Sequence, residues 1–219
     1  MQQCLHHPAS IAERREGQNA LRLDAIERLT VTVLYGWLAV RVVLHLGAAV
    51  GFANALPLLS EGLVVVFVLV RRPTLRISRR PAEWLLALAS TCAPLLVIPA
   101  ATGSTTFPWL ASAVWLVGML IQLHAKIVLG RSFGLVPAHR GLKVTGPYRL
   151  VRHPMYAGYL LTHLAFLSLS PSLWNLLVYV VCYSVQIPRL LAEERLLSRD
   201  PSYVQYAGAV KYRLLPGIF

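Results

Sequence analysis

Residues 146–158, GPYRLVRHPMYAG, form the polar junction from which the rest of the fold can be worked out. The stretch lies between two apolar segments and gathers two Arg, one His and two Tyr around two Pro. Pro154 has a fixed φ and no donor N–H, which suits the first position of a helix. We therefore expect an apolar helix to begin at Pro154, with His153 as its capping residue.

The groups at this junction suit a ligand site as well as a structural turn. Free backbone N–H groups at the start of a helix favour an anionic ligand group. Tyr156 could stack on a ring, and Gly158, which has no Cβ, lets a ligand or another helix approach. The alternative is an ordinary membrane-entry turn in which Arg149 and Arg152 extend toward lipid headgroups.

The composition of the whole chain is typical of a membrane protein. Of 219 residues, 56% are hydrophobic and 14% are charged, and the mean hydropathy is +0.58. Because about 20 helical residues cross a hydrocarbon core, we expect an all-α integral membrane bundle of about six transmembrane helices. They lie near residues 31–52, 55–70, 82–101, 108–128, 155–170 and 172–188. The second is the least secure, since it is short and contains Pro57 and Glu61.

Basic residues are sorted along the chain. Of the 21 Lys and Arg, 20 lie in segments that six spans would place on one side of the membrane. The positive-inside rule then puts both termini in the cytoplasm of a multi-pass protein, which we expect in a bacterial inner membrane. The net charge of +12 is accounted for by anionic lipids at the cytoplasmic face, and no nucleic-acid partner is expected.

Three regions follow from this pattern, without a linker that separates domains. Residues 1–30 form an N-terminal cytoplasmic tail, in which residues 11–30 suit a helix lying in the interface. Residues 31–124 contain the N-terminal transmembrane helices. Residues 125–219 contain a cytoplasmic loop, the last two transmembrane helices and a C-terminal tail.

Arg41 is the exception to the charge sorting, because it lies within the first span, with His45 one turn later. Ionisable residues at that depth usually face the bundle interior and often carry function. The alternative is an internal ion pair with Glu61 or Glu83. The three cysteines show no paired CxxC pattern, so neither a disulfide nor a zinc site is expected.

A second polar cluster, PRLLAEERLL at residues 188–197, follows the sixth span. Arg189 and Glu193 are four residues apart and therefore share a helix face, and Glu194 lies on the neighbouring one. An exposed ion pair is the structural alternative for Arg189 and Glu193.

Taken together, GPYRLVRHPMYAG, EERLL, SYVQY and RLLPGIF, in this order, resemble the isoprenylcysteine carboxyl methyltransferase family of integral membrane enzymes. The wider group includes phospholipid N-methyltransferases and thiol methyltransferases. The resemblance covers roughly residues 125–219. It implies S-adenosylmethionine as cofactor and a lipophilic small molecule or prenylated group from the bilayer as acceptor. A carboxylate is the favoured methylated group, as in isoprenylcysteine carboxyl O-methylation.

The resemblance also implies roles for particular residues. Arg189 matches the Arg that faces the acceptor's nucleophilic group, and Glu193 a carboxylate that holds the cofactor. The implied cofactor-binding residues are Arg140, Gly141, Leu142, Lys143, Tyr148, His153, Pro154, Met155, Tyr156, Glu193 and Glu194.

Two departures and two rival functions accompany the resemblance. Phe133 stands about where eukaryotic relatives have a polar residue that contacts the cofactor, and the Glu pair is about two residues closer to the SYVQY tyrosines. Membrane sterol reductases carry a segment similar to GPYRLVRHP and use a nicotinamide cofactor. A non-catalytic membrane component or a small transporter is the other alternative.

Overall fold

The computed structural model describes residues 11–46, 62–74, 76–98 and 106–218. The structure is all-α, as expected. Its helices are α1 (Ile11–Leu46), residues 62–70, α3 (Pro81–Cys92), α4 (Pro108–Leu129), α5 (Pro154–Leu169), α6 (Leu173–Leu197) and α7 (Pro201–Ala209). Short 3₁₀ turns are η1 (Ala93–Leu96), η2 (Gly130–Ser132) and η3 (Gly146–Arg149).

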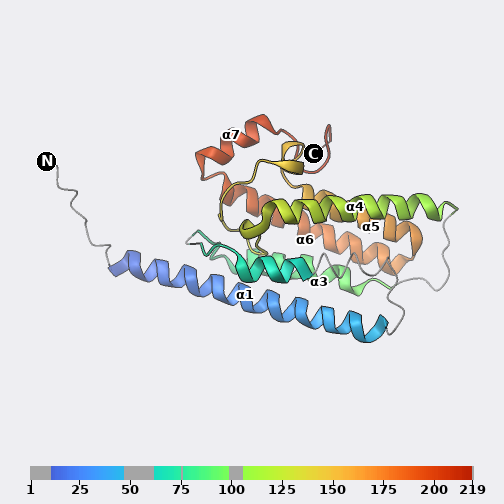
Figure 1. Ribbon diagram of the computed structural model, residues 1–219, viewed down its shortest axis with the longest axis horizontal. Coiled ribbons are helices and arrows are strands. Elements are labelled where there is room, and N and C mark those ends of the chain that lie inside the picture. The colour runs from blue at the N-terminus through green and yellow to red at the C-terminus, as the bar shows by residue number, and fades with distance from the viewer. Residues whose placement is uncertain (1–10, 47–61, 75, 99–105, 219) are drawn as a thin grey trace.

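The helices form an elongated bundle in which α4 packs against α5 and α3 packs against α6 (Figure 1). The connection between α4 and α5, helix α7 and the C-terminal tail gather on one side, and α1 runs along the other. Gly118 and Gly158 bring α4 and α5 together, because a Cβ built on Gly158 would lie 2.7 Å from the Gly118 carbonyl oxygen. Gly158 therefore serves the approach of another helix.

Local sequence explains where several helices begin. Pro81, Pro108, Pro154 and Pro201 each occupy the first helical position, where a missing N–H costs no hydrogen bond. The predicted start of a helix at Pro154 is confirmed. His153 is the preceding N-cap residue, but its side chain makes no capping hydrogen bond.

Two of the described helical segments are long and apolar enough to cross a membrane. They are Pro108–Ser132 and Leu173–Leu197, with mean hydropathies of 1.7 and 1.4. The count of six spans stays a prediction, and residues 55–61 of the second predicted span lie outside the described residues. The side chains of Arg41 and His45 also lie outside the described part of the structure.

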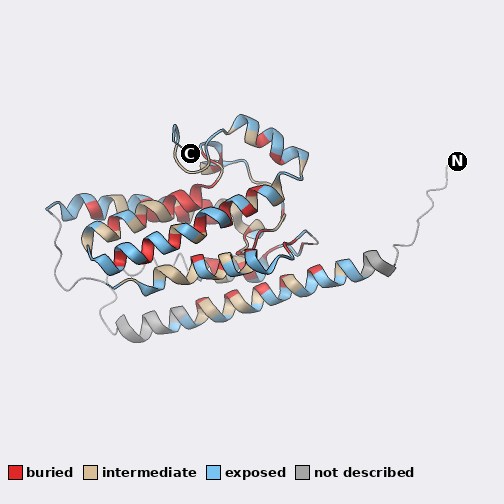
Figure 2. Ribbon diagram, turned by 180° about the vertical axis from the view of Figure 1, so that it is seen from behind, coloured by how far each residue is buried: buried red, intermediate tan, exposed pale blue. Residues whose placement is uncertain are grey.

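Helix α1 differs from the expected separate interfacial helix. It continues without a break from Ile11 to Leu46 and buries the carboxylates of Asp24 and Glu27. Figure 2 shows buried residues along the sides of the helices that face one another and exposed residues on the outer sides. Large apolar side chains such as Leu85, Trp109 and Leu173 are exposed, as expected of surfaces that contact lipid.

Candidate functional site

Two cavities meet at the beginning of α5. The first, which we call the apolar cavity, has a volume of about 370 Å³ and lies among α1, α3, α4, α5 and α6. The second, which we call the polar cavity, lies between the α4–α5 connection, α6 and α7. Met155 lines both. The two cavities therefore adjoin at Met155.

The polar cavity brings together most of the residues that the resemblance implies for the cofactor. Those lining it are Arg140, Gly141, Leu142, Lys143, Tyr148, His153, Met155, Tyr156 and Glu193. Pro154 and Glu194 do not line it. Gly141 has a φ of +101°, a conformation that favours glycine, so this position helps to shape the wall.

Glu193 and Tyr156 connect the polar cavity to the apolar one. The Tyr156 hydroxyl donates to Glu193 Oε2 at 3.0 Å. The guanidinium carbon of Arg189, which lines the apolar cavity, lies 5.6 Å from the centroid of the Tyr156 ring. Tyr156 of α5 therefore contacts both Glu193, which lines the polar cavity, and Arg189, which lines the apolar cavity.

Glu194 has a different environment from its neighbour. It is buried and accepts hydrogen bonds from Arg213 Nε at 2.6 Å and from the Tyr203 hydroxyl at 3.3 Å. Arg152 Nη1 lies 2.9 Å and His153 Nε2 lies 3.3 Å from its carboxylate. Because four side chains already contact this carboxylate, Glu194 joins α5, α7 and the C-terminal tail.

Backbone pairing completes the attachment of the C-terminal tail. The Arg152 N–H donates to the Tyr212 carbonyl at 2.9 Å, and the His153 N–H donates to the Arg213 carbonyl at 2.8 Å. These bonds satisfy backbone groups at the residues just before α5. The tail thus forms part of the frame of the polar cavity.

Three tyrosines form an aromatic wall of the polar cavity. Burial raises the pKa of Tyr148 and of Tyr203 well above the usual value, and raises that of Tyr206 to about 12. The Tyr206 hydroxyl donates to the Tyr148 carbonyl at 2.7 Å. These phenols therefore stay neutral near pH 7 and offer ring faces rather than charge.

Arg189 is buried, with 5% of its surface exposed. Its Nη1 donates to Ser90 Oγ at 2.9 Å and its Nη2 to the Leu135 carbonyl at 2.8 Å. Its Nε has no hydrogen-bond partner among the described residues. The alternative of an exposed ion pair with Glu193 is therefore wrong, since Arg189 is buried and its two hydrogen-bond partners are neutral.

Two carboxylates of α1 hold the connection between α4 and α5. Glu27 Oε1 accepts from the backbone N–H groups of Leu135 and Val136 at 2.6 and 3.0 Å. Arg140 Nη2 contacts Asp24 at 2.9 Å and Glu27 at 2.7 Å. The Arg140 guanidinium, although it borders the polar cavity, is thus paired with α1.

Arg71 adds a second buried cation to these carboxylates. Its guanidinium forms ion pairs with Asp24 at 2.9 Å and Glu27 at 3.0 Å, and burial lowers its pKa. Sequence reasoning missed this cluster. The available signal was the i, i+3 spacing of Asp24 and Glu27, which places two acids on one face of a helix in a basic segment.

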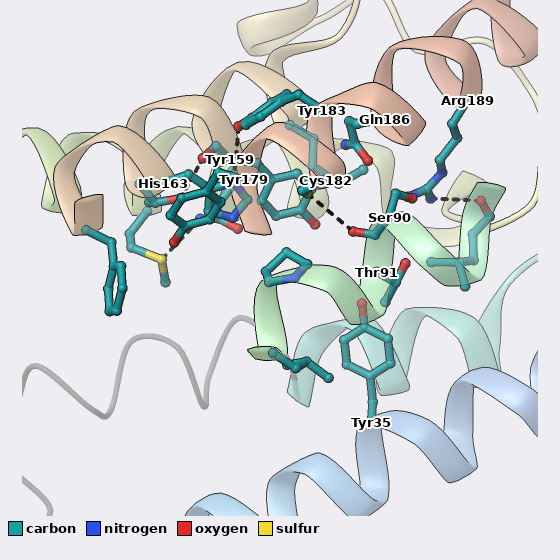
Figure 3. A pocket seen from close by; sticks show the side chains of 18 of the residues that line it. Tyr35, Ser90, Thr91, Tyr159, His163, Tyr179, Cys182, Tyr183, Gln186 and Arg189 are labelled. Atoms are coloured by element: carbon teal, nitrogen blue, oxygen red, sulfur yellow. Dashed lines mark hydrogen bonds between the residues drawn. The ribbon is translucent and has the colours of Figure 1, made fainter. Parts of the chain in front are cut away.

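Figure 3 shows the apolar cavity with its mixed wall of aromatic, aliphatic and polar side chains. Phe133 and Leu135, from the α4–α5 connection, line this cavity and not the polar one. Phe133 therefore borders the apolar cavity in this protein. On the α5 side, His163 Nδ1 lies 3.1 Å from the Tyr183 hydroxyl.

Comparison with known proteins finds one family model that matches the central part of the chain. Residues 106–202 match the model of the phospholipid methyltransferase family. These membrane enzymes use S-adenosylmethionine and transfer a methyl group to a lipid acceptor. No curated protein matches the chain. The family match supports the methyltransferase resemblance over the reductase and transporter alternatives.

Proposed function

We propose that this protein transfers a methyl group from S-adenosylmethionine to the carboxylate of a lipophilic acceptor, as in isoprenylcysteine carboxyl O-methylation. The observation that carries the choice of a carboxylate is the environment of Arg189. This buried cation has only neutral hydrogen-bond partners among the described residues and keeps an unpartnered Nε at the apolar cavity. An unpaired buried charge is costly, so an anionic acceptor group would stabilise it.

The chemistry of the polar cavity fits the cofactor. S-adenosylmethionine presents a carboxylate, an ammonium, ribose hydroxyls and an adenine ring. Glu193 would accept from the hydroxyls or the ammonium, and Lys143 and the N-terminus of α5 would bind the carboxylate. Tyr148 and Tyr203 would contact the adenine ring.

The polar cavity is small for this task. Its volume is about 80 Å³, whereas pockets for ligands of comparable size usually exceed about 300 Å³. Helix α7 contributes Tyr203 and Tyr206 to its wall. We therefore expect α7 or the α4–α5 connection to move outward when the cofactor binds.

When bound, the cofactor supplies an electrophilic methyl group on a positively charged sulfur. The chain would contribute placement and exclusion of water. Arg189 would orient the acceptor carboxylate, and the apolar side chains of Phe133 and Met155 would keep water from the reacting groups. A carboxylate is already ionised near pH 7, so no residue has to remove a proton from it.

The family match favours a second candidate, the N-methylation of a phospholipid amine. In that case Arg189 would bind the phosphate of the headgroup and the hydrocarbon chains would occupy the apolar cavity. An amine loses a proton on methylation, so this reaction also needs a proton acceptor.

Methyl transfer with labelled S-adenosylmethionine tests the proposal. The purified protein should methylate a prenylated cysteine derivative and not the same molecule without its carboxylate. Arg189→Lys keeps the charge but loses the planar fork, so turnover should fall on the order of 100-fold while cofactor affinity changes less than about twofold. Arg195→Lys, an exposed position on the same helix, is the matched control and should change neither.

Other results would reject the assignment. Methylation of phosphatidylethanolamine without methylation of any carboxylate would establish the second candidate. Loss of cofactor binding in a folded Arg189→Lys protein would remove this residue from the acceptor side.

A further inference from the structure

Helix α6 contributes further polar side chains to the wall of the apolar cavity on the N-terminal side of Arg189. Gln186 and Tyr183 precede Arg189 by three and six residues, and both line the cavity. At 1.5 Å per residue they lie about 4.5 and 9 Å from Arg189 along the helix axis. Figure 3 shows Gln186 between Tyr183 and Arg189.

Gln186 is buried without the hydrogen bond that its burial calls for. Only 7% of its surface is exposed, and its Oε1 has no partner in the part of the chain that the structure describes. Buried polar atoms in folded proteins nearly always have a partner. Since the side chain borders a cavity, a bound molecule can supply the missing donor.

Neighbouring polar groups on the cavity wall already have partners. The hydroxyls of Ser90 and Thr91 donate to the Ala87 carbonyl of their own helix. His163 and Tyr183 contact each other at 3.1 Å. Among the described residues that line the cavity, Gln186 therefore stands out because it has a buried acceptor without a partner next to Arg189.

We propose that the acceptor carries a second polar group, a hydroxyl or an amide N–H, close to its carboxylate, and that this group donates a hydrogen bond to Gln186. Gln186 is then a specificity-determining residue of the apolar cavity. The inference rests on the proposed function, because the carboxylate at Arg189 fixes the position of the second group. A site built to accept a hydrogen bond discriminates against a ligand that lacks the donor.

Two matched pairs of carboxylates test this proposal by binding alone. The first pair is N-dodecanoylglycine and dodecanoyloxyacetate, which differ by an amide N–H in place of an ester oxygen. The second pair is 3-hydroxytetradecanoate and tetradecanoate. Affinities are measured by isothermal titration on the full-length protein in detergent micelles, so that no methyl transfer is required.

The wild-type protein should bind the donor-bearing member of at least one pair about tenfold more tightly, the scale of one net hydrogen bond. Gln186→Met keeps the length of the side chain but accepts no comparable bond, so the preference should fall below about twofold. The affinity for the member without a donor should persist. Ser184→Ala is the control, because this exposed hydroxyl bonds the Val181 carbonyl of α6, and it should keep the preference.

Equal affinities within both pairs for the wild-type protein would overturn the proposal, as would a preference that survives in Gln186→Met. Failure of the proposed function would look different. In that case the methyl-transfer assay would show no methylated carboxylate, whatever affinities the two pairs give, because the binding test measures no methyl transfer.

Discussion

The polar cavity and the apolar cavity adjoin at Met155 but are held together by different forces. Charged groups fix the frame of the polar cavity, through Glu194 with the C-terminal tail and through the α1 carboxylates with Arg140. Packed side chains from several helices form most of the apolar cavity, and Arg189 is the charged residue among the described residues of its wall. The contrast supports the proposal that one space binds a charged, water-soluble cofactor and the other a molecule from the bilayer.

The difference also indicates how each cavity should respond to mutation. Removing one member of a buried ionic cluster leaves the other charges without compensation, so the frame of the polar cavity should be sensitive to single substitutions. A substitution in a packed apolar wall lowers the stability of the protein mainly according to the side-chain volume that it removes. The three predictions that follow use this contrast, in order of decreasing effect.

Glu27→Ala should produce the largest loss of stability. Glu27 pairs with Arg71 and Arg140 and accepts from two backbone N–H groups, all in buried positions. We expect the free energy of unfolding to fall by about 3–5 kcal/mol, the usual result of breaking a buried ionic cluster. Thermal unfolding in detergent measures this.

Glu16→Ala is the control for that experiment. Glu16 forms an exposed pair with Arg79 at 3.4 Å, and such pairs contribute under about 1 kcal/mol. Equal melting temperatures for the Glu27 and Glu16 variants would show that the α1 carboxylates do not hold the frame.

Glu193→Gln should separate the two cavities functionally. If Glu193 holds the cofactor, its loss weakens S-adenosylmethionine binding by about 1–3 kcal/mol, while acceptor binding in the apolar cavity stays unchanged. Titration of each ligand separately measures the two effects. Glu83→Gln is the control, because Glu83 lines neither cavity; an equal loss of cofactor affinity in both variants would argue against a contact by Glu193.

Tyr206→Phe should have the smallest effect, visible in the pH dependence of stability. Burial raises the pKa of Tyr206 to about 12, from about 10 when unfolded. The neutral phenol is therefore favoured in the folded state, so its contribution is complete below pH 10 and is lost as the pH rises toward 12. Melting temperatures between pH 9 and 12 should fall less steeply for Tyr206→Phe; parallel curves would contradict this.

Local features of the chain could be predicted from sequence because they depend on neighbouring residues. The start of α5 follows from Pro154. The motif residues from Arg140 to Tyr156 were expected to lie together, and most of them do line one cavity. The position of Glu194 outside that cavity could not be predicted, because it depends on where Arg213 of the tail approaches this carboxylate.

Long-range contacts account for most of what was missed. Glu27 meets Leu135 across 108 residues, and Arg189 meets Ser90 across 99. Neither pairing leaves a local pattern in the sequence. The apolar cavity itself was likewise not predicted, since the resemblance implied only an acceptor from the bilayer. Gln186 carried no signal, because a polar residue in an apolar helix does not reveal whether it has a partner.

The backbone bonds between the C-terminal tail and residues 152–153 have a consequence for biosynthesis. Ribosomes add about 5–20 residues per second, so Arg213 is made roughly 3–12 s after His153. Once Leu197 has been added, the nascent chain contains α5 and α6 but still lacks Arg213, which pairs with Glu194, and the carbonyl groups that accept from the backbone N–H groups before α5. The polar cavity can therefore be completed only after α5, α6 and the C-terminal tail have all been synthesised.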